Sequence, residues 1–68
     1  MQITADKRDS IRNEFGPKVT IRFLPDNGAP KMYCNPGTCT VVFNLHAIDD
    51  DRELSQLVKQ AKGHLGIK

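Results

Sequence analysis

The last third of the chain carries one continuous apolar stripe, and this feature most constrains the fold. Its members recur at intervals of three and four residues: Leu54, Leu57, Val58, Ala61 and Leu65. Residues spaced in this way share one helix face, so we expect a helix from about Asp50 to Lys62 or beyond. A helix with such a stripe must bury it against another element, and the rest of the chain has to supply that surface.

Acidic residues mark the start of this helix. Asp50 and Glu53 have the spacing of a capping box, with Asp in the place of the usual Ser or Thr. Carboxylates in a first turn also offset the helix dipole. We therefore interpret Asp49, Asp50 and Asp51 as capping residues rather than as metal ligands, and Gly63 and Gly66 as alternative ends of the helix.

Two earlier segments alternate apolar and polar side chains, which is the pattern of half-buried strands. The first runs from Lys18 to Leu24 and the second from Cys39 to His46. A short strand from Lys31 to Cys34 is expected between them. The turn that precedes this short strand contains Asn27-Gly28, a dipeptide that favours a tight hairpin.

A first helix is expected from Ala5 to Phe15. Thr4 or Asp6 can cap its start, and Gly16 with Pro17 ends it. Its thin apolar side consists of Ala5, Ile11 and Phe15. The chain thus reads α-β-β-β-α.

These elements predict one small α+β domain over residues 1–68, since a chain of this length supports a single core. Two successive hairpins would make the three-stranded sheet antiparallel. Both helices should cover the same face of that sheet, because the strands alternate and leave their other face polar. Which strand lies at the edge is left open.

Counting by twos along the strands assigns their side chains to the two faces. The face under the helices is expected to hold Val19, Ile21, Phe23, Met32, Cys34, Cys39, Val41, Phe43 and Leu45. The outward set, called here the open face, is Thr20, Arg22, Lys31, Tyr33, Thr40, Val42, Asn44 and His46. A four-residue loop would place Cys34 opposite Cys39, where the two are core residues, either reduced or bridged.

The composition is that of an ordinary globular chain, with 38% hydrophobic and 26% charged residues and a formal net charge of +2. Mild positive charge permits a polyanionic partner without requiring one. A chain this small has little room to enclose a substrate. We expect no catalytic residues, no cofactor, no metal and no small-molecule substrate.

The N-terminal residues lack the apolar run of a secretory signal. No segment has the roughly 18 apolar residues that a membrane span requires. We therefore expect a cytoplasmic protein without a membrane partner.

Five residues of the open face are candidates for partner binding: Arg22, Lys31, Tyr33, Asn44 and His46. They combine two cations, several hydrogen-bonding groups and an aromatic ring. Asp50 and Asp51, at the start of the last helix, form a second candidate surface of opposite charge.

We expect these surfaces to bind a partner protein, so that the chain acts as a non-enzymatic inhibitor or adaptor. The alternative is RNA binding by the open face, in which cations contact phosphate and Tyr33 stacks on a base. Arg8 and Arg12 lie four residues apart on one face of the first helix and are a further candidate pair for contacting phosphates. Neighbouring acidic residues dilute their charge, and a mixed solvated helix face is the simpler interpretation.

The order α-β-β-β-α resembles that of double-stranded-RNA-binding domains and of HicA-type toxins, the small ribonucleases of toxin–antitoxin pairs. The second resemblance covers about the last forty residues. It rests on Asn27-Gly28, on Asn35-Pro36-Gly37, on a strand ending in His46, and on the helical segment from Leu54 to Ala61. By this resemblance, the chain would be a small ribonuclease.

Two departures separate the chain from these families. The HicA family carries its catalytic histidine at the start of the second strand, where this chain has Pro30 and Lys31. The last helix opens with acidic residues, whereas double-stranded-RNA-binding domains carry basic lysines there. A ribonuclease would have to use His46 as an acid–base residue together with Lys31, and this is the third hypothesis.

Overall fold

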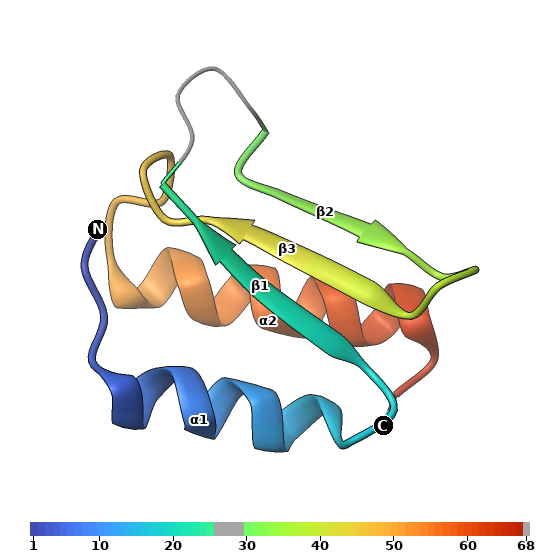
Figure 1. Ribbon diagram of the computed structural model, residues 1–68. Coiled ribbons are helices and arrows are strands. Elements are labelled where there is room, and N and C mark those ends of the chain that lie inside the picture. The colour runs from blue at the N-terminus through green and yellow to red at the C-terminus, as the bar shows by residue number, and fades with distance from the viewer. Residues whose placement is uncertain (26–29, 68) are drawn as a thin grey trace.

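The computed structural model describes residues 1–25 and 30–67, and it has the predicted order of elements. In chain order these are α1 (Ala5–Phe15), β1 (Thr20–Leu24), β2 (Met32–Asn35), β3 (Thr40–Asn44) and α2 (Asp51–Leu65). Both helices lie on one side of the sheet (Figure 1). The small α+β fold is therefore confirmed. The turn predicted at Asn27-Gly28 lies outside the described residues.

The sheet is mixed, so the prediction of a purely antiparallel sheet was wrong. The strand order is β1-β3-β2, with β1 parallel to β3 and β2 antiparallel to it. β1 and β2 are consecutive in the sequence, yet they lie on opposite sides of β3 and do not pair with each other. They form the two edges of the sheet.

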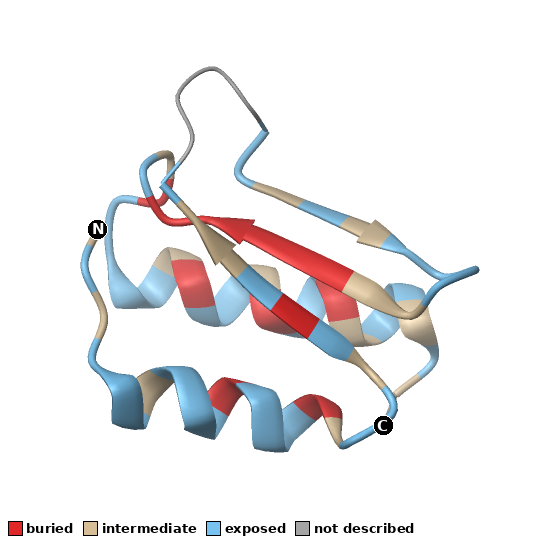
Figure 2. Cartoon of the chain, viewed as in Figure 1, coloured by how far each residue is buried: buried red, intermediate tan, exposed pale blue. Residues whose placement is uncertain are grey.

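Burial gives the physical reason for the central position of β3. This strand contains the uninterrupted apolar run Val41-Val42-Phe43, which is typical of a strand covered on both faces. Val41 and Phe43 are fully buried under the helices, and Val42 on the opposite face is only 3% exposed. β1 and β2 alternate more regularly and expose their polar residues, as Figure 2 shows. A central β3 therefore keeps the most apolar strand away from water.

The hairpin between β2 and β3 turns one residue later than predicted. Asn35 pairs with Thr40 across it, so the predicted pairing of Cys34 with Cys39 is wrong. Asn35 organises the turn: its carbonyl oxygen and its Oδ1 each accept an amide hydrogen bond from the loop at 3.2 Å. Cys39 ends the loop with a positive φ of 53°.

The helix α1 has the bounds that the sequence predicts. Thr4 is its N-cap, and its side chain accepts a hydrogen bond from the amide of Lys7 at 3.1 Å. Gly16 ends the helix with a φ of 87°, which favours glycine. Ile11 and Phe15 are buried, but Ala5 is exposed and does not belong to the apolar side.

The helix α2 is capped as its acidic start predicts. Asp50 is the N-cap, and its Oδ1 accepts from the amide of Glu53 at 2.8 Å. The side chain of Glu53 reaches back to the amide of Asp49, at 3.3 Å. Gly66, in the left-handed region with a φ of 72°, is the C-cap.

The core lies between the two helices and the sheet face that they cover. Its buried members are Ile11, Phe15, Ile21, Val41, Phe43, Ile48, Leu54, Val58 and Ala61. Leu57 and Leu65 pack against this cluster and are partly buried, so the whole predicted stripe of α2 contributes. The predicted division of strand side chains between the two faces is correct for the paired residues, because the apolar partners in the register belong to this cluster.

Candidate functional site

On the open face of the sheet, one side chain from each strand lies in a row, and the central one, Val42, is buried. Val42 is the register partner of both Arg22 in β1 and Tyr33 in β2, so it lies between them. Tyr33 is a large hydrophobic side chain that is 51% exposed. Arg22 is also exposed. The predicted candidates Arg22 and Tyr33 are thus brought onto one surface, about two strand spacings (roughly 10 Å) apart.

Lys31 was predicted to belong to the open face, but its side chain is directed to the helix α2. It lies just before β2, and its Nζ donates to Oε1 of Glu53 in the first turn of α2. This hydrogen bond raises the pKa of Lys31 and lowers the pKa of Glu53. The ammonium group is therefore held by the acidic start of α2, and this contact joins the residue before β2 to that helix.

Asn44 and His46 were predicted to be exposed on the open face, but Asn44 is buried and His46 lies in the turn after β3. Asn44 ends β3 and is only 3% exposed. Its Oδ1 accepts from the backbone amide of His46 at 3.2 Å, which fixes the turn after the strand. His46 is exposed in this turn rather than on the sheet, because β3 ends two residues earlier than predicted.

The two acidic candidates at the start of α2 differ from each other. The carboxylate of Asp50 is engaged in capping the helix, through its bond to the amide of Glu53. Asp51 is exposed in the first helical turn. Both residues are exposed, so the difference between them is that Asp50 has a capping role in addition.

The cysteines are free thiols in half-buried positions. Burial, with a smaller contribution from Cys39, raises the pKa of Cys34 above its ordinary value of 9.0. A thiol with a raised pKa is largely protonated at neutral pH and is a weak nucleophile. In the described part of the chain, no three His, Cys, Asp or Glu side chains gather as a metal site would require. No helix in residues 1–25 and 30–67 is long and apolar enough to cross a bilayer.

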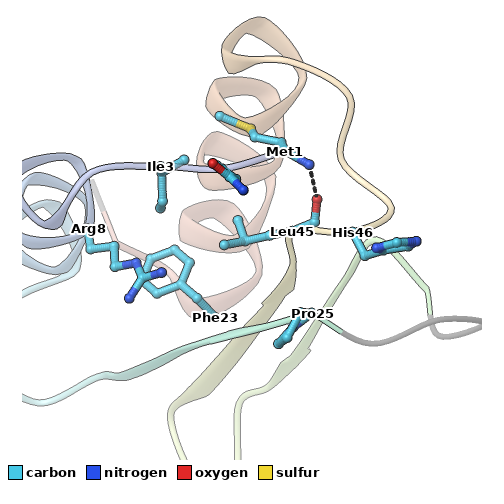
Figure 3. Close-up of a pocket in the computed structure, with 8 residues that line it drawn as sticks. Met1, Ile3, Arg8, Phe23, Pro25, Leu45 and His46 are labelled. Atoms are coloured by element: carbon cyan, nitrogen blue, oxygen red, sulfur yellow. Dashed lines mark hydrogen bonds between the residues drawn. The ribbon is translucent and has the colours of Figure 1, made fainter.

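A hollow of about 540 Å³ lies between the N-terminal segment, the start of α1 and the ends of β1 and β3 (Figure 3). Ile3, Phe23 and Leu45 supply apolar walls, while Arg8 and His46 supply polar ones. The nitrogen of Met1 donates to the carbonyl oxygen of Leu45 at 2.8 Å and anchors the N-terminal segment at the hollow.

Two arginines of α1 gather at the β1 edge, an arrangement that the sequence did not predict. The guanidinium carbons of Arg8 and Arg12 lie 5.8 Å and 5.5 Å from the centroid of the Phe23 ring. These are cation–π distances. The spacing of the arginines placed them on one helix face. Their common contact with Phe23 depends on β1 lying at the edge beside α1, and the sequence alone did not predict that position.

The two helices and three strands form a small α+β domain with a mixed sheet, one covered sheet face and one open face. No protein-family model, no curated protein and no solved structure matches this chain.

Proposed function

We propose that the chain is a small, non-enzymatic protein-binding domain that occupies a partner protein, as an inhibitor or adaptor does. The observation that carries the proposal is the row of Arg22, Val42 and Tyr33 across the open face. Arginine and tyrosine are enriched where proteins bind one another, especially at positions of high binding energy. Here the two exposed side chains lie on either side of the buried Val42, on a sheet face that neither helix covers.

The rigidity of this surface supports the same proposal. The three residues come from paired strands, so the spacing of their backbones is set by the sheet. Tyr33 offers a large amphipathic contact area and has only two side-chain torsions to restrict on binding. A surface that is ordered before binding loses little conformational entropy when the partner arrives.

Nucleic-acid binding by the open face is less well supported than protein binding. A stacking platform combines several aromatic rings with a cationic path for the backbone. Among the described residues of the open face, Tyr33 supplies a single aromatic ring, which is fewer than such a platform uses. The ammonium of Lys31, which was expected to contact phosphate there, is bound to Glu53. A ribonuclease that uses His46 with Lys31 loses support for the same reason.

A photo-crosslinking residue placed at Tyr33 tests the proposal in an extract of the source cells. The matched control carries the same residue at Gln60, which is exposed on α2. We expect a defined adduct from position 33 that nuclease treatment leaves intact and that is absent from position 60. The adduct should also disappear when Arg22→Ala is added, because the two residues belong to one surface.

Two results would overturn the proposal. One is an adduct at position 33 that ribonuclease reduces to the size of the chain alone, which would establish nucleic-acid binding instead. The other is labelling of equal extent at positions 33 and 60, or no labelling at either position.

A further inference from the structure

The outer edge of β1 is unpaired in the part of the chain that the structure describes, since β1 pairs with β3 alone. The amide of Thr20 donates to Cys39 at 2.9 Å, and the carbonyl of Leu24 accepts from Leu45 at 2.9 Å. Thr20 and Leu24, together with Arg22 between them, therefore direct their backbone groups toward β3. By alternation, Ile21 and Phe23 direct their amide and carbonyl groups outward. An edge of this kind is a template for an additional strand.

The helix α1 lines this edge with positive charge. Arg8 and Arg12 lie over the ring of Phe23, at 5.8 Å and 5.5 Å from its centroid, on the helix-covered side of the strand. Phe23 is itself stacked on Phe43, with centroids 5.7 Å apart. The two guanidinium groups are thus supported by a fixed aromatic surface beside the strand. Arg12 also contacts Asp9 at 3.6 Å, but both side chains are exposed and the pair is weak.

Hollows lie along α1 at both ends of the β1 edge. The one at the end of β1 has a volume of about 540 Å³ and includes Arg8, Phe23 and Pro25 in its walls. The one before the start of β1 has a volume of about 330 Å³ and includes Arg12 and Val19. Side chains of an added strand would find space on either side of the arginine pair.

Charge also argues against a second copy of this chain as the occupant. On the opposite face of β1, Arg22 is exposed, and Lys18 is exposed just before the strand. Two β1 edges that paired with each other would bring these cations together, and like charges across a strand pair are destabilising. A strand that carries carboxylates has the complementary charge.

We propose that an extended acidic segment of a partner protein adds to the edge of β1 as a fourth strand, with carboxylates beside Arg8 and Arg12. This inference rests on the proposed protein-binding function and specifies the chemistry of the partner. The resulting order would be segment-β1-β3-β2. Backbone hydrogen bonds to Ile21 and Phe23 would supply affinity, and the arginine pair would select acidic side chains.

The test is a nuclear magnetic resonance titration with an eight-residue peptide of alternating glutamate and threonine that has blocked ends. We expect shifts and slowed hydrogen exchange at the amides of Ile21 and Phe23. The double variant Arg8→Gln, Arg12→Gln should weaken binding roughly tenfold, as the loss of two exposed charge pairs implies. The matched control Arg52→Gln, Lys59→Gln removes the same charge from exposed positions of α2 and should bind as the wild type does.

Two N-methylated peptides separate strand addition from simple charge attraction. One carries the methyl groups on its glutamates and the other on its threonines, so only one of them blocks the edge that faces β1. Unequal binding supports the inference. Equal binding overturns it, as does the absence of changes at the amides of Ile21 and Phe23.

Single-stranded oligouridylate is the competing ligand. Binding of this RNA at Arg8 and Arg12, without binding of the acidic peptide, would overturn the inference in favour of nucleic acid. Failure of the peptide leaves the crosslinking result at Tyr33 untouched. The β1-edge inference and the protein-binding proposal can therefore fail separately.

Discussion

The ring of Phe23 in β1 stacks on the ring of Phe43 in β3, with centroids 5.7 Å apart and planes inclined by 22°. The pair follows from the parallel register, in which these two residues are direct partners. Phe15 of α1 approaches Phe43 at 6.3 Å, so that helix and sheet meet on one buried ring. Phe43, which is fully buried, is therefore the residue on which the packing of α1 against the sheet depends.

Replacement of Phe43 should have the largest effect on stability. Phe43→Ala should cost about 3–5 kcal/mol, from lost burial and from the cavity left behind. This is a large share of the stability of a small domain, so the milder Phe43→Leu should be measured beside it by urea denaturation. The control Tyr33→Ala, at a half-exposed position, should change stability by about 0.5 kcal/mol or less. Similar losses at the two positions would contradict the described core.

Hydrogen exchange can distinguish the mixed sheet from an antiparallel one. The carbonyl of Lys31 accepts a hydrogen bond from the amide of Asn44 at 2.8 Å. Every second residue from Lys31 onward therefore directs its backbone amide and carbonyl toward β3, and Tyr33 is one of them. The amide of Tyr33 should therefore exchange slowly, whereas the amides of Met32 and Cys34 should exchange faster. In the sheet with β2 at its centre, all three amides would be protected, and that result would contradict the β1-β3-β2 order.

The local features of the fold were predictable because they depend on neighbours in the sequence. The bounds of α1, the cap at Asp50 and the apolar stripe of α2 each follow from the spacing of a few residues. Strand order depends on which strands are buried on both sides. The signal for it was present in Val41-Val42-Phe43, but the hairpin dipeptide Asn27-Gly28 favoured the wrong pairing.

The candidate site was predictable only where the alternation of a strand decided it. Arg22 and Tyr33 share the open face because their strands pair through Val42. Alternation gives the direction in which a side chain leaves the backbone, but it does not give the partner that a long flexible side chain reaches. Lys31 therefore binds Glu53, which is distant in the sequence, and this contact could not be predicted from spacing.

The Lys31–Glu53 pair should make stability depend on pH in the acidic range. The hydrogen bond from Lys31, and to a lesser degree the Asp49 amide, holds the pKa of Glu53 below its ordinary value of 4.5. The unfolded chain then binds the proton more readily. The contribution is complete above pH 4.5 and is lost as the pH falls through the folded pKa.

Glu53→Gln should accordingly destabilise the domain at neutral pH, and the difference from the wild type should shrink at about pH 3. Urea denaturation at both pH values measures this difference. Glu14→Gln, at an exposed position of α1, is the matched control for loss of one carboxylate and should have a smaller effect at neutral pH. A difference between Glu53→Gln and wild type that stays constant with pH would contradict the ion pair.

The N-cap residue of α2, Asp50, should contribute more to stability than the next residue, Asp51. Asp50→Ala removes the acceptor for the amide of Glu53 and should cost about 1 kcal/mol of stability. Asp51→Ala removes a carboxylate from the same helix turn without removing a capping bond, and it should cost a few tenths of a kcal/mol. Thermal denaturation of the two variants gives the comparison, and equal losses would show that the cap contributes nothing beyond charge.

The central position of the last strand has a consequence for the order of events during synthesis. β1 and β2 both form hydrogen bonds with β3. Ile21 is synthesised twenty residues before its register partner Val41, so it has no strand partner until Val41 has been added. A chain that emerges from the ribosome N-terminus first therefore carries two unpaired strands until the segment after Thr40 has left the exit tunnel. The sheet cannot grow one hairpin at a time from its N-terminal end. A nascent chain stalled before β3 would expose both strand edges to chaperones or to aggregation.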